Sequence, residues 1–429
     1  MNAEVGTTSR HFVLAAGGTG GHLTPAFALA QELDRRGHHV ALITDERGAA
    51  IPGKPDFLPA HVLPAGRFGK NPLGWPAAIR AVLKGRSMAK RLYETFQPSA
   101  VVGFGGYPAL PALLGAQSMD IPTVIHEQNA VLGRVNRLMA GRVNAVATAY
   151  PEVDRLDAKH NDKVHLVGNP VRPEVLSLRD EPFPAFTEDG LFRVLVTGGS
   201  QGARVLSQIV PHGLSMLPTA LRSRLQVTQQ CRPEDLDGVR ATYAEYDIPA
   251  ELGTYFEDMA SRLADAHLFI GRAGASTIAE LTAVGRPAIL IPLPIATDDH
   301  QTANVREMVA AGGARAIKQP MSTVADLDNA DFSEKTNADR SKQSNVLQKL
   351  AKDVGRQIQA MAQRPDTLSN AAHAAWNCGR PKAASELADL VEGFGGADMM
   401  DVIRVGENNA RGASQGVEAG QGAAREKPE

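Results

Sequence analysis

The residue types that bind phosphate occur in two glycine-rich turns, each directly after a run of apolar residues. Residues 17–22 (GGTGGH) form the first turn, and residues 198–202 (GGSQG) form the second, about 180 positions later. Small residues let backbone N–H groups approach an anion, and the start of the following helix adds the positive end of its dipole. Two such turns indicate a phosphate-bearing substrate shared by two α/β units across a cleft.

His22 ends the first turn, where a predicted helix begins. The usual histidine pKa of about 6.5 suits proton transfer near neutral pH. We therefore take His22 as the first candidate for a general base, although a histidine that only caps the helix fits the spacing equally well. Glu127 is the second candidate.

Polar and glycine residues also follow two buried strand patterns in the first half. Residues 126–129 (HEQN) come after an apolar strand, and residues 103–107 (GFGGY) form a third turn that permits close approach. Polar side chains buried at a strand end are costly unless they are paired or used. Because parallel strands bind ligands at their carboxyl edge, we expect these segments to meet at one site.

The second half carries a similar arrangement. Residues 271–277 (GRAGAST) precede a helix that contains Glu280. Open amides at this helix start suit a diphosphate, and a carboxylate one turn later could accept hydrogen bonds from both hydroxyls of a ribose. A glutamate that only stabilises the first helical turn is the alternative. Residues 298–304 (DDHQTAN) enter the next helix and offer carboxamides for sugar hydroxyls.

Strand-like and helix-like patterns alternate in both halves, which is typical of a parallel sheet covered by helices on both faces. The predicted fold is therefore α/β, with two Rossmann-like, doubly wound domains that face each other. The predicted divisions are a flexible N-terminus (1–10), an N-terminal domain (11–170), a hinge and linker (171–190), a C-terminal domain (191–400) and a disordered tail (404–429). Residues 320–345 are polar and read as an irregular surface insertion, followed by helices near 346–362 and 381–393.

Bulk composition excludes several classes of protein. The formal net charge is −2, so no overall field draws the chain to nucleic acid or to a membrane. The two cysteines lie far apart, as is usual for reduced thiols in a cytosol. No Cys/His cluster has zinc spacing. Residues 95–119 lack charge but contain several glycines and prolines, so we expect no membrane span there.

Residues 57–93 contain no Asp or Glu, and cations alternate there with large apolar side chains. Such a segment can lie on an anionic lipid leaflet. A solvated helix whose apolar stripe faces the core is the alternative. The residues expected at the membrane are Lys70, Trp75, Ile79, Arg80, Leu83 and Lys84.

A dinucleotide-binding domain is the simplest alternative for the first turn. Its glycines do not follow the G-x-G-x-x-G order, and Asp45 lies farther on than the usual spacing of about 20 residues to the ribose-binding acid. NAD binding is therefore the less favoured interpretation.

Taken together, the motifs resemble those of the bacterial MurG glycosyltransferase family. They run in order over roughly residues 11–320 and include GGTGGHLTPAFALA, GFGGYPALPALL, HEQNAVLGRVNRL, VGNPVR, GGSQGAR, GRAGASTIAEL and DDHQTAN. HEQN and GGSQGAR together separate this family from other two-domain sugar transferases.

This resemblance implies a GT-B fold and an inverting transfer of N-acetylglucosamine (GlcNAc) from UDP-GlcNAc to the 4-hydroxyl of the muramoyl sugar in lipid I, the undecaprenyl-diphospho-MurNAc-pentapeptide. The product would be lipid II, the cell-wall precursor. It implies no bound catalytic metal, no cofactor and no nucleic acid partner. It also implies a peripheral enzyme on the cytoplasmic face of the inner membrane, near the proteins of cell-wall synthesis and division.

The resemblance also carries donor-binding roles onto this sequence. The residues concerned come from the two glycine turns, the hinge and the second domain: Thr19, Gly20, Gly21, Asn129, Arg172, Ser200, Gln201, Phe256, Ala275, Ser276, Thr277, Glu280, Gln301 and Asn304. Phe256 stands where an aliphatic residue is common, so only its backbone is expected at the uracil.

Three other functions remain open on sequence grounds. The first is a related transferase that acts on a diacylglycerol-type lipid. The second is a membrane adaptor that binds a nucleotide sugar without catalysis. The third is an oxidoreductase.

Overall fold

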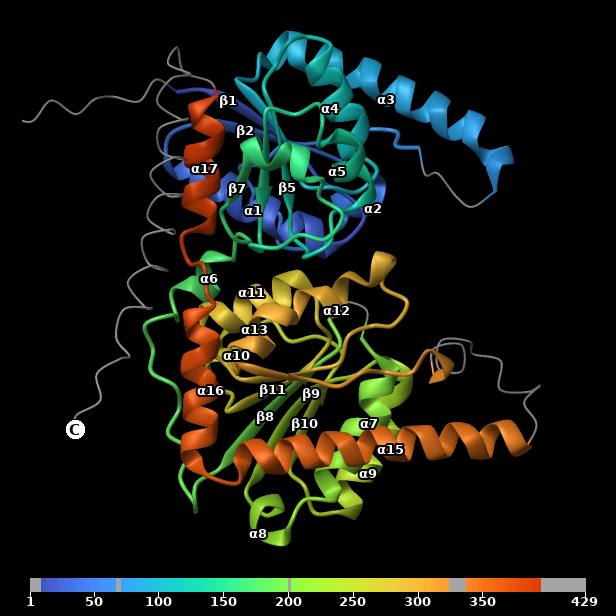
Figure 1. Cartoon of the computed structure of the whole chain (residues 1–429), viewed down its shortest axis with the longest axis vertical. Coiled ribbons are helices and arrows are strands. Elements are labelled where there is room, and N and C mark those ends of the chain that lie inside the picture. Colours follow the sequence, from blue (N-terminus) through green and yellow to red (C-terminus); the bar gives the residue numbers. More distant parts are fainter. Residues whose placement is uncertain (1–8, 67–70, 200–201, 324–336, 395–429) are drawn as a thin grey trace, which may run out of the picture.

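Two lobes, each built on one parallel sheet, make up the protein (Figure 1). The structure is a computed structural model that describes residues 9–66, 71–199, 202–323 and 337–394. Within these residues every strand pairing is parallel. The predicted α/β fold with two doubly wound domains is confirmed.

The sheet of the first lobe has seven strands in the order β3-β2-β1-β4-β5-β6-β7. Its strands are β1 (His11–Ala15), β2 (His39–Thr44), β3 (Ala60–Val62), β4 (Ala100–Gly103), β5 (Thr123–Glu127), β6 (Ala145–Thr148) and β7 (Val164–Leu166). The order reverses between β1 and β4, where Ala15 lies opposite Gly103. Ligands bind at such a reversal in open α/β sheets. The turns 17–22 and 103–107 both begin there.

Helices cover both faces of this sheet. They are α1 (Gly20–Arg35), α2 (Glu46–Ala49), α3 (Trp75–Phe96), α4 (Ala109–Gln117) and α5 (Arg134–Met139), with short 3₁₀ turns η1 (Pro72–Gly74) and η2 (Ala158–Lys163). Alternation along β1 divides the core. Phe12 and Leu14 pack on the α1 side, whereas Val13 and Ala15 pack on the α3–α4 side.

The second lobe repeats this plan with six strands in the order β10-β9-β8-β11-β12-β13. The strands are β8 (Phe192–Thr197), β9 (Leu225–Gln230), β10 (Ala250–Gly253), β11 (Leu268–Gly271), β12 (Ala288–Leu290) and β13 (Ala314–Ala316). The order reverses between β8 and β11, where Thr197 lies opposite Gly271. The turn after β8 and the loop 271–277 therefore start at one point of the sheet edge.

The helices of the second half are more numerous. They are α6 (Pro173–Leu176), α7 (Arg204–Ser215), α8 (Thr219–Arg222), α9 (Leu236–Glu245), α10 (Met259–Asp265), α11 (Ala275–Ala283), α12 (His300–Asn304), α13 (Arg306–Ala310), α15 (Asn337–Ala362), α16 (Pro365–Asn377) and α17 (Ala383–Gly393). Three 3₁₀ turns join them: η3 (Pro233–Asp235), η4 (Thr297–Asp299) and η5 (Met321–Thr323). Among the described residues, no helix is both long enough and apolar enough to cross a bilayer.

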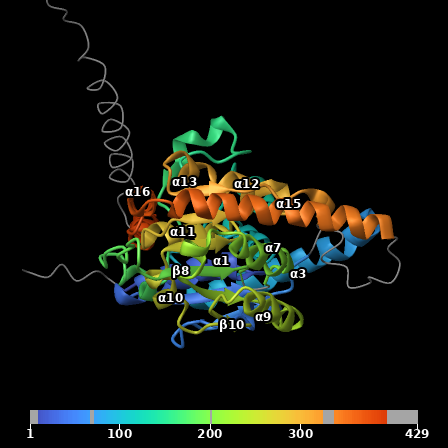
Figure 2. The same ribbon diagram turned by 90° about the horizontal axis from the view of Figure 1, so that it is seen from below.

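Helix α15 corrects part of the expected insertion at 320–345, because the helix already begins at Asn337. Its later part packs closely along α7: a Cβ on Gly355 would lie 2.8 Å from the carbonyl oxygen of Gly213. Its first part extends beyond the lobe (Figure 2). Residues 337–345 contain no large apolar side chain, so no apolar period in the sequence marks the start of this helix. Residues 324–336 lie outside the described part.

Helix α17 corrects the predicted C-terminal domain of 191–400. Helix α16 packs on the second lobe, but α17 continues along the same side of the molecule onto the first lobe (Figure 1). Its apolar face, with Leu387, Ala388, Leu390 and Val391, joins the core beside α1. The first lobe is therefore completed by the end of the described chain. Residues 1–8 of the predicted flexible N-terminus lie outside the described residues, and so does the whole predicted tail (404–429).

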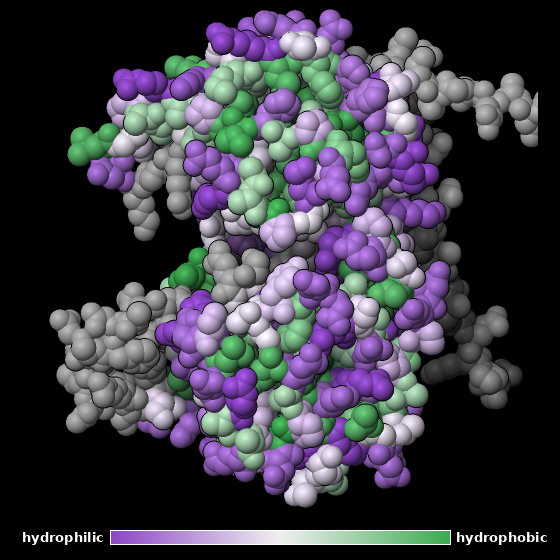
Figure 3. Space-filling view, turned by 180° about the vertical axis from the view of Figure 1, so that it is seen from behind, coloured by the Kyte–Doolittle hydropathy of each residue, from purple (hydrophilic) through white to green (hydrophobic). Residues whose placement is uncertain are grey.

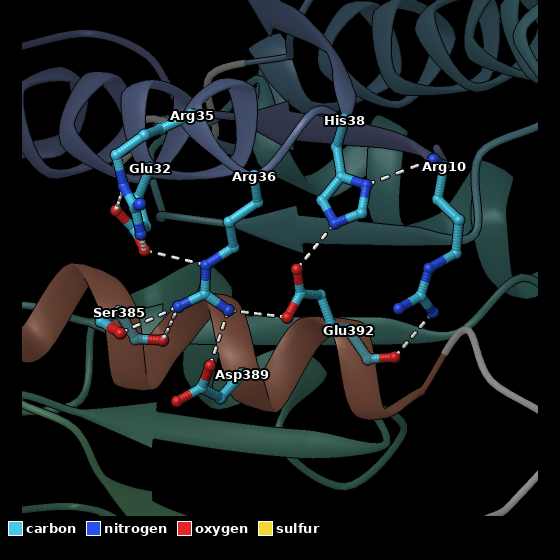
Figure 4. A network of polar contacts seen from close by, with 8 residues as sticks. All are labelled: Arg10, Glu32, Arg35, Arg36, His38, Ser385, Asp389 and Glu392. Carbon is cyan, nitrogen blue, oxygen red and sulfur yellow. Dashed lines mark hydrogen bonds and ion pairs between the residues drawn. The ribbon is translucent and has the colours of Figure 1, made fainter. Parts of the chain in front are cut away.

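A polar network fixes α17 to the end of α1 (Figure 4). Arg36 donates to Asp389 and to Glu392, each at 2.6 Å. Glu392 also accepts from Nε2 of His38 at 2.7 Å. The Nδ1 of His38 accepts from the backbone N–H of Arg10 at 3.2 Å, so the neutral Nε2–H tautomer satisfies both contacts. The network determines where α17 lies along the first lobe.

Candidate active site

A cavity of about 680 Å³ lies between the two lobes, at the carboxyl edges of both sheets. An indentation between the lobes is visible from behind (Figure 3). The first lobe contributes Gly20, Gly21 and Thr24, and the second contributes residues from the β8 turn, the start of α11 and Gln301. A larger cavity, of about 1010 Å³, lies between α7, α9 and α15 and contains none of the predicted site residues.

The start of α11 forms one wall of the inter-lobe cavity through Ala275, Ser276 and Thr277. Gly274 is the N-cap residue, with no side-chain cap, and the first turn has no acidic residue. The hydroxyl of Ser276 is buried and has no hydrogen-bond partner among the described residues. Open amides and an unpaired hydroxyl at a helix N-terminus are suited to a phosphate.

The two glycine turns are shaped by close contacts. A Cβ on Gly198 would lie 2.3 Å from the backbone nitrogen of Ala203, and one on Gly17 would lie 2.4 Å from Pro108. A Cβ on Gly106 would lie 2.6 Å from the carbonyl oxygen of Gly17. These positions therefore exclude any side chain, and the loops after β1 and β4 are held together. Ser200 and Gln201 lie outside the described residues.

Three arginines line the same cavity from the second lobe: Arg204, Arg232 and Arg272. Arg272 donates through Nη1 to Gln319 at 2.7 Å and to the carbonyl of Ile291 at 3.1 Å. Guanidinium groups bind phosphate oxygens well. The three arginines lie in segments far apart in the sequence, so no local pattern predicts that they line one site.

His22 lies at the start of α1 and is half-buried. Its Nδ1 is 3.0 Å from the carbonyl oxygen of Gly17. A carbonyl only accepts hydrogen bonds, so Nδ1 carries the proton and Nε2 keeps its lone pair. Burial lowers the pKa of His22, while the Gly17 carbonyl and Glu127 act in the opposite direction. His22 therefore has the tautomer and the charge state of a general base.

Glu127, the second candidate base, is 2% exposed. Its Oε1 accepts from the backbone and side chain of Asn129, at 3.1 and 3.2 Å. Its Oε2 accepts from the N–H of Gly133 at 2.8 Å and from Asn136 at 2.9 Å. With both oxygens occupied, Glu127 is better suited to hold the loop after β5 than to accept a substrate proton.

His126 and Gln128 of the same motif are also used inside the protein. The Nε2 of His126 is 2.8 Å from the carbonyl of Gly168, and its Nδ1 is 3.0 Å from the side chain of Gln128. Burial lowers the pKa of His126 to about 4. The HEQN segment thus satisfies the expectation that buried polar residues are paired.

Glu280 and Arg172, two predicted donor-binding residues, contact each other. The Nε of Arg172 donates to Oε1 of Glu280 at 2.8 Å. Burial raises the pKa of Glu280, and Arg172 opposes this shift. Arg172, in the hinge segment, therefore orients the carboxylate of Glu280. Neither residue lines the inter-lobe cavity described above.

Phe256 and the two asparagines have contacts that the sequence did not indicate. Phe256 is nearly buried and lies under the guanidinium of Arg262, 4.3 Å from its ring centroid. Asn304 donates to Oδ1 of Asn129 at 3.1 Å and accepts from the N–H of Ala130 at 2.8 Å. The sequence predicted the carboxamide of Asn304 at the sugar. In the structure, this carboxamide forms hydrogen bonds that join the two lobes.

Large apolar side chains lie exposed on the outer face of α3, and a different set of residues forms its buried face. Leu73 just before the helix is 87% exposed, and Trp75, Ile79 and Leu83 are each about half exposed. Arg80 and Lys84 are exposed beside them. The core-facing alternative is wrong for these residues, because Ala78, Val82, Gly85, Ala89 and Tyr93 make the buried face. Lys70 lies outside the described residues.

Comparisons with known proteins agree with this geometry. Residues 12–148 match the glycosyltransferase family 28 N-terminal domain, and residues 193–375 match the glycosyltransferase family 28 C-terminal domain. A relative from Erythrobacter litoralis is 74% identical and covers 98% of this chain and 99% of its own length. One from Novosphingobium aromaticivorans is 71% identical and covers 93% and 96%.

Both relatives are named UDP-N-acetylglucosamine–N-acetylmuramyl-(pentapeptide) pyrophosphoryl-undecaprenol N-acetylglucosamine transferase. Among solved structures, MurG from Acinetobacter baumannii is similar, with a TM-score of 0.67 and 27% identity. That match covers 89% of this chain and 99% of the other. The two lobes therefore have the GT-B fold.

Proposed function

This chain belongs to the MurG transferases of glycosyltransferase family 28, and we propose from that premise how its residues perform the reaction. The chain transfers GlcNAc from UDP-GlcNAc to the 4-hydroxyl of the muramoyl sugar of lipid I and so forms lipid II. The diacylglycerol-type acceptor considered above is not favoured by these relatives.

The donor diphosphate binds in the inter-lobe cavity. The backbone N–H groups of Ala275, Ser276 and Thr277 donate to the phosphate oxygens, together with those of Gly20 and Gly21 from the first lobe. As UDP leaves, charge develops on the β-phosphate, and preorganised amides and arginines stabilise it. The buried, unpaired hydroxyl of Ser276 is the observation that most directly supports this placement.

The remaining donor contacts come from the hinge and from α12. Glu280, oriented by Arg172, binds the ribose hydroxyls with its free oxygen. Gln301 lines the cavity, and its Oε1 accepts from the N–H groups of Ala273 and Leu293, at 3.2 and 2.9 Å. Its Nε2 is then available to donate to the sugar. Thr19 and Asn129 lie on the first-lobe side, and the backbone of Phe256 is placed beside uracil.

His22 is the general base. Its Nε2 removes the proton from the acceptor hydroxyl while that oxygen attacks the anomeric carbon of GlcNAc. UDP departs from the opposite face, so the anomeric configuration inverts. A positioned base of this kind contributes about 10²–10⁴-fold to the rate.

Peripheral binding to the membrane brings the lipid-linked acceptor to the cleft. The exposed apolar residues of α3 enter the interface, and Arg80 and Lys84 contact anionic lipid headgroups. This face projects from the first lobe on the side of the indentation (Figure 3). We place the enzyme on the cytoplasmic side of the inner membrane, where proteins of cell-wall synthesis and division are candidate partners.

The proposal is tested by incubating the protein with UDP-GlcNAc and a lipid I analogue and following UDP release. We expect transfer to the muramoyl acceptor, none to diacylglycerol, and retention of activity in EDTA. Donor binding without turnover on a competent acceptor would instead support the adaptor function. An NAD-linked oxidoreductase would be stabilised by NAD and not by UDP.

A further inference from the structure

Segment 298–306 of the second lobe contacts the first lobe at three points. The bonds of Asn304 to Asn129 and Ala130 form one point. Arg306 forms a second, as a bidentate pair with Asp154 at 2.8 and 2.9 Å. Asp298 forms the third and lies between two arginines of the first lobe.

The carboxylate of Asp298 is held on both oxygens. Its Oδ2 accepts from Nη2 of Arg137, in α5, at 2.8 Å, and its Oδ1 lies 2.7 Å from Nη1 of Arg155, which follows β6. The Asp298 side chain is 19% exposed, less than either arginine. Burial acts to raise the pKa of Asp298, but the two arginines outweigh it and lower that pKa.

The backbone at this contact is unusual. Asp298 and Asp299 are consecutive non-glycine residues with left-handed φ values of 57° and 56°, and Arg155 opposite has 66°. Such conformations cost free energy and persist where surrounding contacts fix them. Because the turn at 298–299 directly precedes α12, its conformation determines where α12 begins. Gln301, which lines the donor cavity, is the second residue of that helix.

We propose that Asp298 is a positioning residue for the donor: Arg137 and Arg155 of the first lobe hold the turn that places Gln301. This rests on the donor site proposed above and adds a coupling between the lobes. When the lobes are together, the arginines stabilise the turn and Gln301 faces the cavity. When the pairs are broken, the turn loses the contacts that hold it left-handed, and donor affinity falls.

The test compares Asp298→Asn with Asp298→Gly by steady-state kinetics and by calorimetric titration with UDP-GlcNAc in the absence of acceptor. Asparagine tolerates the left-handed region and removes the charge, and glycine adopts it at no steric cost and removes the side chain. We expect both to raise the donor KM and the Kd for UDP-GlcNAc about tenfold, with kcat at saturating donor within about twofold of the wild type. A role of the backbone alone predicts wild-type values for both, which would overturn the proposal.

A double-mutant cycle tests the partner. Arg155→Gln should raise the donor KM severalfold, and Arg155→Gln combined with Asp298→Asn should be no worse than Asp298→Asn alone. Arg306→Gln is the matched control, because it breaks an exposed pair across the same interface without touching the turn; we expect less than a threefold change. The proposal would be overturned if the increases in donor KM of the two single variants multiplied in the double variant. It would also be overturned if Arg306→Gln raised the donor KM as much as Asp298→Asn.

The two proposals fail in different ways. A wild-type protein that binds UDP-GlcNAc and transfers GlcNAc, with an Asp298→Asn variant that binds UDP-GlcNAc equally well, refutes only the positioning role. A wild-type protein that binds no UDP refutes the donor site itself, and the positioning role with it.

Discussion

The ring of His22 approaches Gly105 across the site, so that a Cβ on Gly105 would lie 3.3 Å from Nε2 of His22. His22 lies in the first turn of α1, the helix after β1, and Gly105 lies in the loop after β4. The two loops meet where the strand order reverses. The absence of a side chain at Gly105 therefore leaves space beside Nε2, the atom of His22 that would accept a proton.

His22→Ala should reduce kcat about 10²–10⁴-fold while leaving UDP affinity nearly unchanged, because the ring acts on the acceptor and not on the nucleotide. Steady-state kinetics with a lipid I analogue and a titration with UDP measure the two quantities separately. Unchanged turnover would remove His22 from the role of base.

The pH dependence of kcat/KM should follow the lowered pKa of His22. The neutral form is active, and burial favours the neutral form, so activity should persist below pH 6.5 and be lost only as His22 becomes protonated at lower pH. The acid limb should disappear from the residual activity of His22→Gln. An acid limb at or above pH 6.5 would contradict this.

Gly105→Ala should lower kcat by about 10–100-fold, because the new methyl group disturbs the reacting nitrogen. Gly37→Ala is the matched control: Gly37 also has a positive φ, of 84°, but its Cβ would meet nothing within 4 Å. Both variants should lose similar stability from the left-handed backbone, measured as Tm. Equal kcat values for the two variants would show that the space beside His22 does not matter.

Glu280→Gln should raise the donor KM about 10–100-fold with little change in kcat, since hydrogen bonds to charged groups are worth about 1.5–3 kcal/mol. Glu174→Gln provides the control, because Glu174 also pairs with Arg172, at 3.4 Å, but is largely exposed. A loss of kcat alone in Glu280→Gln would argue against ribose binding.

Replacing Arg80 and Lys84 by Gln should weaken flotation with anionic liposomes about fivefold per cation at low salt. The difference from the wild type should shrink at high salt, because the screening length is about 8 Å at physiological ionic strength. Trp75→Ser with Leu83→Ser should weaken binding at every salt concentration. Leu191→Ser, at an exposed apolar residue just before β8 in the second lobe, should have no effect. If replacing Arg80 and Lys84 does not change flotation, only the apolar residues contribute to membrane binding.

Local patterns predicted the strands and the glycine turns, because Gly17 and Gly198 lie so close to neighbouring atoms that no side chain fits at either position. The roles of Asn304 and Asp298 could not be predicted this way. Their partners, Asn129, Arg137 and Arg155, lie more than 140 positions earlier in the chain. These pairs form only because the two lobes contact each other in the folded protein. The residue pattern within one segment carries no information about a contact with a distant segment.

The return of α17 to the first lobe limits how this enzyme can be divided. A fragment that ended in the linker would leave the surface of α1 and β1 without Leu387 and Val391, and its exposed hydrophobic face would favour aggregation. Chimeras that exchange lobes between relatives should therefore take residues 383–393 from the same parent as residues 11–166. With a single junction at the linker, the first lobe would come from one parent and α17 from the other. The contact between Arg36 and Glu392 would then join residues from different parents.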